Sequence, residues 1–285
     1  MKKTLIVVGY GNMAKAILTN NSFVGEYYHL IIAGRCAHKA YDFITQCALD
    51  ACVYEARVES SSGKNVIDIE GKDILLCTKP AGLESFVFQG KANGIYSVLA
   101  GASIAMIQKH LSASFMVRLM PNIAANSKLS ATAFYYHISD TKDSAQILYN
   151  EIRPFIESFG TAVQVDNEAL IESSIATSGS CIAFLALIAE SLIDAGILEG
   201  LNEQQSIALV KQTFVGFAAE LAHKSPSELK YAISSPGGTT IRGLAVLEES
   251  GVRGTLIKAA HTATEHARKA IQKYSTQDNL VPKKC

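Results

Sequence analysis

The chain of 285 residues is 48% hydrophobic and 18% charged, and its 26 basic residues balance its 26 acidic ones. This composition excludes a disordered chain, and the absence of net charge argues against nucleic acid or an anionic membrane surface as a partner. The length suits two domains of ordinary size, and the apolar excess predicts burial between the subunits of a homo-oligomer.

Cysteine and histidine spacing predicts no metal site, because the six cysteines include no C-x-x-C pair and the seven histidines are not spaced as ligands beside them. The N-terminal apolar run is interrupted by Gly9 and Gly11 and is followed by no small-residue cleavage site. We therefore assign it to the fold rather than to a signal peptide. A cytoplasmic protein that acts on a small molecule is expected.

The N-terminal segment has the pattern of a strand, a tight turn and a helix. Residues 4–8 form an apolar, β-rich run, Gly9 and Gly11 interrupt it, and residues 12–18 have a helix-forming composition. The pattern G-x-G-x-x-A suits a dinucleotide, because the first glycine allows the turn and the second lets a pyrophosphate approach the backbone, while Ala14 packs the helix on the strand. An ordinary strand-to-helix turn is the alternative.

The next apolar run, residues 30–33, ends in Gly34 and Arg35. An NAD-binding domain would place an acidic residue there to hold the ribose hydroxyls, and none is present. Arg35 offers instead a fork of donors for a 2′-phosphate, so the sequence favours NADPH over NADH. An ordinary surface arginine at a strand end is the alternative.

Further apolar runs predict the rest of a sheet. Residues 73–78, 96–99 and 115–119 have the pattern of buried strands, and residues 131–137 that of one more strand near the sheet edge. Strands that alternate with helical stretches predict a doubly wound parallel sheet of the α/β class, with ligands at the carboxyl ends of its strands. Such ends are occupied by Lys79, Pro80, Ala100 and Gly101. For the lysine–proline pair, a simple strand terminator is the alternative.

From about Asp166 the apolar period becomes helical, and we place a domain boundary between residues 161 and 162. The helix from residue 181 is apolar nearly all round, so it packs either against a second copy in a dimer or at the centre of one subunit. Its apolar run ends after about half the length of a bilayer span, so no membrane segment is expected. The predicted helices cover residues 181–195, 203–222, 240–249 and 252–273.

The stretch SSPGGTT, residues 234–240, ends one helix and begins another. Proline and two glycines break the first helix, and Thr239 and Thr240 start the second. The N–H groups of such a helix start, together with two hydroxyls, suit a small carboxylate whose reducible bond lies beside a hydrogen-bond donor. A helix–helix turn with a threonine cap is the plainer alternative.

Six motifs, in this order, resemble those of the pyrroline-5-carboxylate reductase family. They are G-Y-G-N-M-A from residue 9, C-T-K-P from 77, L-A-G from 99, R-L-M-P-N from 118, S-G-S from 178 and S-P-G-G-T-T from 235. The resemblance covers nearly the whole chain, and the last motif is the most specific. It implies an N-terminal Rossmann domain at residues 1–161 and a helical domain for substrate binding and dimerisation at residues 162–285. The implied activity is reduction of Δ1-pyrroline-5-carboxylate to L-proline by NADPH or NADH, the final step of proline biosynthesis.

The resemblance also implies roles for individual residues. The Thr240 hydroxyl would donate to the ring nitrogen of the substrate, and the backbone of Gly238, Thr239 and Thr240 would receive its carboxylate. A donor at nitrogen suits the reduction of a C=N bond without a metal. Ser178 and Ser180 would lie near the same pocket. Cofactor contacts would come from Gly9, Gly11, Asn12, Met13, Arg35, Asn65, Thr78, Lys79, Pro80, Leu99, Ala100 and Gly101.

The wall of the substrate pocket departs from the family pattern. Where the family usually has S-G-S-G-P-A-Y, this chain has S-G-S-C-I-A-F, with Cys181, Ile182 and Phe184 as the changed residues. This departure leaves three alternatives: a reductase of another cyclic imine, a β-hydroxyacid dehydrogenase, and an NADPH-binding protein that has lost catalysis. The dehydrogenase is disfavoured, because the second domain has no clear counterpart of its catalytic lysine.

Overall fold

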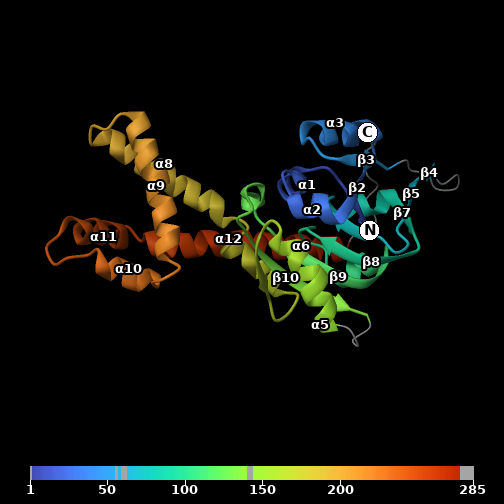
Figure 1. Ribbon diagram of the computed structural model, residues 1–285. Helices are drawn as coiled ribbons and strands as arrows, with labels where there is room; N and C mark the ends of the chain where they lie inside the picture. Colours follow the sequence, from blue (N-terminus) through green and yellow to red (C-terminus); the bar gives the residue numbers. More distant parts are fainter. Residues whose placement is uncertain (1, 55–56, 59–62, 140–143, 277–285) are drawn as a thin grey trace. The chain divides into compact units, whose positions relative to one another are not determined.

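The computed structural model describes residues 2–54, 57–58, 63–139 and 144–276. The chain forms two compact units (Figure 1). The first contains the chain up to Gly179 together with the segment from Ala263 on, and the second contains Ser180–Thr262. Helix α12 (Val252–Thr276) begins in the second unit and ends in the first.

An eight-stranded sheet forms the centre of the first unit, in the order β11-β10-β9-β8-β6-β1-β2-β3. Neighbouring strands are parallel except β9 and β10, which are antiparallel. The predicted parallel-dominated α/β fold is therefore confirmed. The strands are β1 (Lys3–Val8), β2 (Tyr28–Ala33), β3 (Ala51–Val53), β6 (Asp73–Leu76), β8 (Lys91–Ser97), β9 (Ser112–Met120), β10 (Ser130–Ile138) and β11 (Gly160–Gln164).

Both faces of this sheet are buried. Leu5 and Val7 of β1 belong to one apolar cluster, while Ile6 and Val8 belong to a second cluster on the opposite face. This alternation follows from the two-residue period of a strand, and it explains why β1 has a continuous apolar run. The first unit also contains the helices and helical turns α1 (Asn12–Leu18), α2 (Ser22–Tyr27), α3 (Ala37–Gln46), η1 (Pro80–Ser85), α4 (Ile104–Gln108), η2 (Ile123–Ser127), α5 (Ser144–Ile147), η4 (Leu148–Ile152), α6 (Arg153–Glu157), α7 (Leu170–Ser173) and η5 (Ser174–Ala176).

A second, three-stranded sheet was not predicted. It consists of β4 (Arg57–Val58), β5 (Asn65–Asp68) and β7 (Phe86–Gln89), with β5 in the middle. Ile67 and Phe86 pack in the same apolar cluster as Ile6 of β1, so this small sheet covers one face of the main sheet. The sequence carried a signal for it, because the β-branched and aromatic residues of β5 and β7 favour strands.

The second unit is helical. The four predicted helices are confirmed, and α10, which follows a capping box formed by Ser225 and Glu228, was missed. Asn202 and Gln205 form a second capping box at the start of α9. The helices are α8 (Cys181–Leu198), α9 (Glu203–Glu220), α10 (Pro226–Ala232), α11 (Thr239–Glu249) and the first part of α12.

Helix α8 is apolar but uncovered. None of its residues is buried, and Leu187 is 64% exposed. The alternative of a helix enclosed at the centre of one subunit is therefore wrong. Within the segment Leu170–Leu198, a window of 18 residues has a mean hydropathy of 2.1 and is long and apolar enough to cross a membrane, and no residue of that window is buried within the chain. An exposed apolar surface of this kind is typical of an interaction site.

Candidate active site

The turn between β1 and α1 has the geometry that a dinucleotide needs. Gly9 has a φ of 106°, and a Cβ at this position would lie 2.8 Å from the backbone of Cys77 and Thr78. Its N–H donates to the carbonyl of Ala33 at 2.8 Å. Only glycine fits here, because the ends of β1, β2 and β6 converge on this point. Gly11 is the N-cap of α1, and no side chain caps that helix start.

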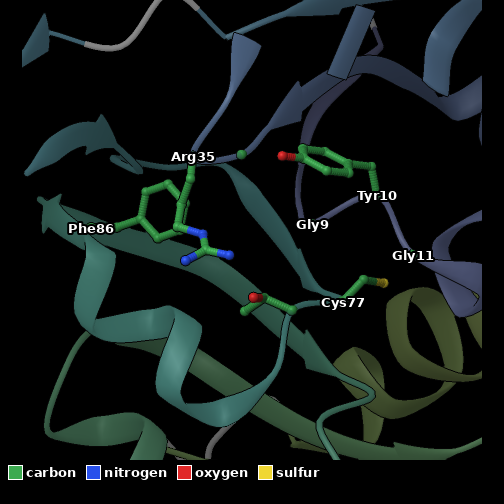
Figure 2. Close-up of a pocket in the computed structure, with 8 residues that line it drawn as sticks. Gly9, Tyr10, Gly11, Arg35, Cys77 and Phe86 are labelled. Atoms are coloured by element: carbon green, nitrogen blue, oxygen red, sulfur yellow. The ribbon is translucent and has the colours of Figure 1, made fainter. Parts of the chain in front are cut away.

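A cavity of about 220 Å³ opens at these strand ends. It brings together four of the predicted cofactor residues, Gly9, Gly11, Arg35 and Thr78. Figure 2 shows the Arg35 side chain extending beside the ring of Phe86. The cavity is also lined by Tyr10, Gly34, Cys77 and Phe86, which sequence reasoning did not single out as cofactor contacts.

Two of these missed residues had a usable signal. Tyr10 lies between the two glycines of the turn, and its ring contacts Gly34 so closely that a Cβ there would be 2.0 Å from Tyr10 Cε1. Cys77 directly follows β6, and burial raises the pKa of its thiol, so the thiol stays neutral and adds no charge to the cavity. Phe86 comes from β7 of the unpredicted sheet, so its place at the cavity depends on tertiary structure.

Asn65 lies close to the Arg35 side of the cavity without lining it. Its Nδ2 donates to the carbonyl oxygen of Gly34 at 3.4 Å, from the start of β5. This contact ties the small sheet to the turn that carries Arg35.

The other predicted cofactor residues lie at strand ends or at the start of α1 and do not line this cavity. Lys79 is the N-cap of η1, and Gly101 has a φ of 84° in the turn after β8. The N–H of Leu99 donates to Ser97 Oγ at 3.3 Å, which fixes the same turn. Outside the cavity lining are Asn12, Met13, Asn65, Lys79, Pro80, Leu99, Ala100 and Gly101.

The predicted substrate residues open α11 in the second unit. Gly238 is the N-cap, and Thr239 and Thr240 are the first two helical residues. No side chain caps this helix start, so the threonine cap in the plainer alternative is wrong, while the helix–helix turn itself is not contradicted. The turn before it depends on Gly237, which has a φ of 72°. The helix thus presents backbone N–H groups that an anion could accept bonds from.

The S-G-S motif spans the end of the first unit and the start of the second. Ser178 is buried, and its hydroxyl donates to the carbonyl of Ala131 and accepts from Asn122 Nδ2 at 3.1 Å. This hydroxyl is therefore already used to hold the chain in place. Ser180 is the N-cap of α8 and makes no side-chain cap bond.

No group of three or more histidine, cysteine or acidic side chains that could hold a metal ion occurs among the described residues.

A family model and curated relatives point to one family. A family model for pyrroline-5-carboxylate reductase dimerisation matches residues 168–270. The pyrroline-5-carboxylate reductase of Helicobacter pylori is 39% identical over 262 residues, which are 92% of this chain and 97% of that protein.

Solved structures agree. The structure of 1-pyrroline-5-carboxylate reductase from Streptococcus pyogenes has a TM-score of 0.77 and 26% identity, and the match covers 93% of this chain and 98% of that one. A Plasmodium falciparum pyrroline carboxylate reductase solved with NADP bound has the same fold, with a TM-score of 0.69 at 22% identity, over 94% of this chain and 99% of that one.

Proposed function

The chain belongs to the pyrroline-5-carboxylate reductase family, and from that membership we propose how its own residues carry out the reaction. The protein is an oxidoreductase that reduces the C=N bond of Δ1-pyrroline-5-carboxylate with NAD(P)H and forms L-proline, the last step of proline biosynthesis. The observation that carries this conclusion is the 39% identity over nearly the full length of the Helicobacter pylori reductase.

The cofactor fits the turn after β1. Gly9 and Gly11 have no side chains, so a pyrophosphate can approach the backbone there, and Arg35 places a guanidinium at the same cavity. Because a guanidinium binds a phosphate with paired, charge-assisted hydrogen bonds, we propose that Arg35 binds the 2′-phosphate and that NADPH is preferred over NADH. When bound, the reduced nicotinamide supplies the hydride.

Three consecutive residues at the start of α11 are proposed to hold the substrate. The backbone N–H groups of Gly238, Thr239 and Thr240 receive its carboxylate, which the positive end of the helix dipole also favours. Reduction leaves an amine at the ring nitrogen, so the Thr240 hydroxyl, donating to that nitrogen, stabilises the developing charge. We propose that Ser178 and Ser180 also contribute to substrate binding; the Ser178 hydroxyl is held by Asn122 and Ala131.

The two proposed sites divide the chain into two domains. We propose that residues 1–161 bind the cofactor and that residues 162–285 bind the substrate and dimerise. The dimerisation family model, which begins at residue 168, supports this boundary.

The protein carries a dimerisation domain, and we propose a homodimer or a larger homo-oligomer as its working state. The uncovered apolar surface of α8 supports a second subunit as its cover, because this helix lies within the matched region. We propose the cytoplasm as its location, with α8 buried in the oligomer rather than in a bilayer.

An assay of the purified protein tests the function. With racemic pyrroline-5-carboxylate, NADPH absorbance should fall at a rate proportional to enzyme, with proline as the product. Thr240→Ala should lower kcat on the order of a hundredfold, as for a lost transition-state donor, and leave NADPH affinity nearly unchanged.

The same assay separates the alternatives. If the protein turns over a six-membered cyclic imine in preference to pyrroline-5-carboxylate, that imine is its substrate and the proposed substrate is wrong. Tight NADPH binding without turnover of any imine would contradict catalysis altogether.

A further inference from the structure

A buried ion cluster joins three segments of the first unit. Arg118 lies on β9, and its side chain is 3% exposed. One guanidinium nitrogen, Nη2, pairs with Oε1 of Glu172, whose side chain is also 3% exposed. The other, Nη1, lies 3.3 Å from Oε1 of Glu168, which is 28% exposed. This arginine belongs to the R-L-M-P-N motif, and the proposed function gives Arg118 itself no role.

The planar fork of the guanidinium allows this bridging. A single arginine donates in two directions at once and faces two carboxylates on different parts of the chain. Buried ion pairs contribute little net stability compared with apolar packing, because both charges lose their water. Their better attested effect is to specify one arrangement of the segments that they connect.

Glu168 extends the cluster to the turn after β8. The same Oε1 that faces Arg118 accepts the N–H of Ile104 at 2.7 Å, at the start of α4. That helix is preceded directly by the turn with Leu99, Ala100 and Gly101, which are proposed cofactor contacts. Glu168 therefore holds the C-terminal end of the cofactor turn.

Glu172 extends the cluster to the S-G-S motif. It lies on α7, which continues through η5 to Ser178. The Ser178 hydroxyl is itself bonded to Asn122, four residues beyond Arg118, and to the carbonyl of Ala131 on β10. The segment from Glu172 to Ser178 is thus anchored at both ends to the β9–β10 pair.

We propose that Arg118 is a positioning residue, whose guanidinium holds the cofactor turn at residues 99–101 and the S-G-S segment in fixed register on β9. This inference rests on the proposed roles of those two segments. Because reacting groups must meet within a fraction of an ångström, loosening this bridge lowers the rate of hydride transfer more than it lowers binding. Arg118 itself touches neither substrate nor cofactor in this scheme.

Two pairs of variants test the inference. Arg118→Lys keeps the charge but loses the fork, so it should lower kcat on the order of tenfold, with both KM values within about threefold of wild type. Glu168→Ala removes the carboxylate oxygen that accepts from both Arg118 and Ile104, so it should lower kcat by a similar factor. Glu168→Gln keeps an oxygen that can accept from Ile104, so its kcat should lie between those of Glu168→Ala and wild type. As a control, Lys72→Met removes a cation that pairs with Asp68 at the surface and should leave kcat unchanged.

Three measurements distinguish a positioning role of Arg118 from a role in stability alone. Each variant is compared with wild type in kcat, in both KM values and in the thermal unfolding midpoint. A merely structural pair would lower the midpoint and leave kcat of the folded protein unchanged, and that result in Arg118→Lys overturns the inference. If Arg118→Lys does not fold, the Glu168→Ala variant provides the test, because Glu168 is only partly buried. A kcat of Glu168→Ala equal to that of wild type would then overturn the inference. A wild type without turnover contradicts the proposed function instead.

Discussion

At the scale of single residues, we propose that Arg35 decides which nicotinamide cofactor the cavity favours. It follows β2 by two positions and lines the same cavity as Gly9 and Gly11. Among the described residues that line the cavity, none has a carboxylate that would hold the 2′-hydroxyl of NADH or repel a 2′-phosphate. In the proposed function, the preference for NADPH therefore depends on one guanidinium.

Replacing this guanidinium should remove the preference. Arg35→Ser loses charge-assisted hydrogen bonds worth about 1.5–3 kcal/mol, so the KM for NADPH should rise roughly ten- to a hundredfold. NADH lacks the 2′-phosphate, and its KM serves as the internal control because it should hardly change. Initial rates with each cofactor measure both values, and an equal rise in the two would contradict a phosphate contact.

A second single residue, Asp73, makes stability depend on pH. It is 1% exposed, and its Oδ1 accepts from Asn93 at 2.7 Å. Burial raises the pKa of this carboxyl in the folded protein. In the unfolded chain it ionises near pH 4. As the pH rises from there through the folded pKa, the unfolded state loses its proton first, so stability falls.

Asp73→Asn should remove this pH dependence. Relative to wild type, its free energy of unfolding should increase between about pH 4 and neutral pH, as measured by urea denaturation at several pH values. Asp68→Asn is the matched control, because the pH dependence of stability that it removes has the opposite sign. A hydrogen bond from Lys72 lowers the pKa of Asp68, so that carboxylate stabilises the fold above its unfolded pKa and loses the effect as the pH falls. Parallel pH profiles for the two variants would refute this account.

At the scale of elements, the turn before α11 sets where the helix begins. Gly237 has a φ of 72°, and Gly251, in the turn after the same helix, has a φ of 68°. Neither would clash with a neighbour if it carried a Cβ. Alanine at either position therefore meets the same backbone strain, about 1 kcal/mol, at opposite ends of one helix.

This symmetry gives a controlled test of the substrate site. Gly237→Ala and Gly251→Ala should lose similar stability in denaturant unfolding. Only Gly237→Ala shifts the N–H groups of Gly238, Thr239 and Thr240, so only its KM for pyrroline-5-carboxylate should rise, several-fold, with the KM for NADPH unchanged. Equal substrate KM values in the two variants would argue against a carboxylate site at this helix start.

At the scale of the whole molecule, the apolar surface of α8 needs a cover that the single chain does not provide. Leu187 of α8 is 64% exposed and lies within the region that matches the dimerisation model. Leu129, between η2 and β10, is 76% exposed and lies outside that region. Burying the first across a subunit interface removes apolar area from water, which stabilises the oligomer.

A charge at each position distinguishes the two surfaces. Leu187→Glu should dissociate the oligomer or weaken it strongly, because a buried, unpaired carboxylate is costly. Leu129→Glu should leave the mass unchanged. Size-exclusion chromatography with light scattering measures both, and a monomeric wild type, or one that co-sediments with lipid vesicles, would contradict burial of α8 between subunits.

Much of the fold could be predicted from the sequence, because its signals are local. The start of α1 and all four predicted helices of the second unit are found within a few residues of their expected bounds. The small sheet and α10 were missed, although aromatic strands and a capping box marked them. β8 begins at Lys91, five residues before its predicted start, because Asn93 and Gly94 obscure its apolar run.

The sequence by itself determined the glycine turn after β1, the helix start at Thr239 and the family, since each depends on residues that are neighbours in the chain. Only the tertiary structure decided which side chains share the cavity and which buried ion pairs join distant segments. Phe86 reaches the cavity from a separate sheet, and Arg118 pairs with Glu172, 54 residues away. Local propensity carries no information about such pairs, because packing of the whole sheet brings them together.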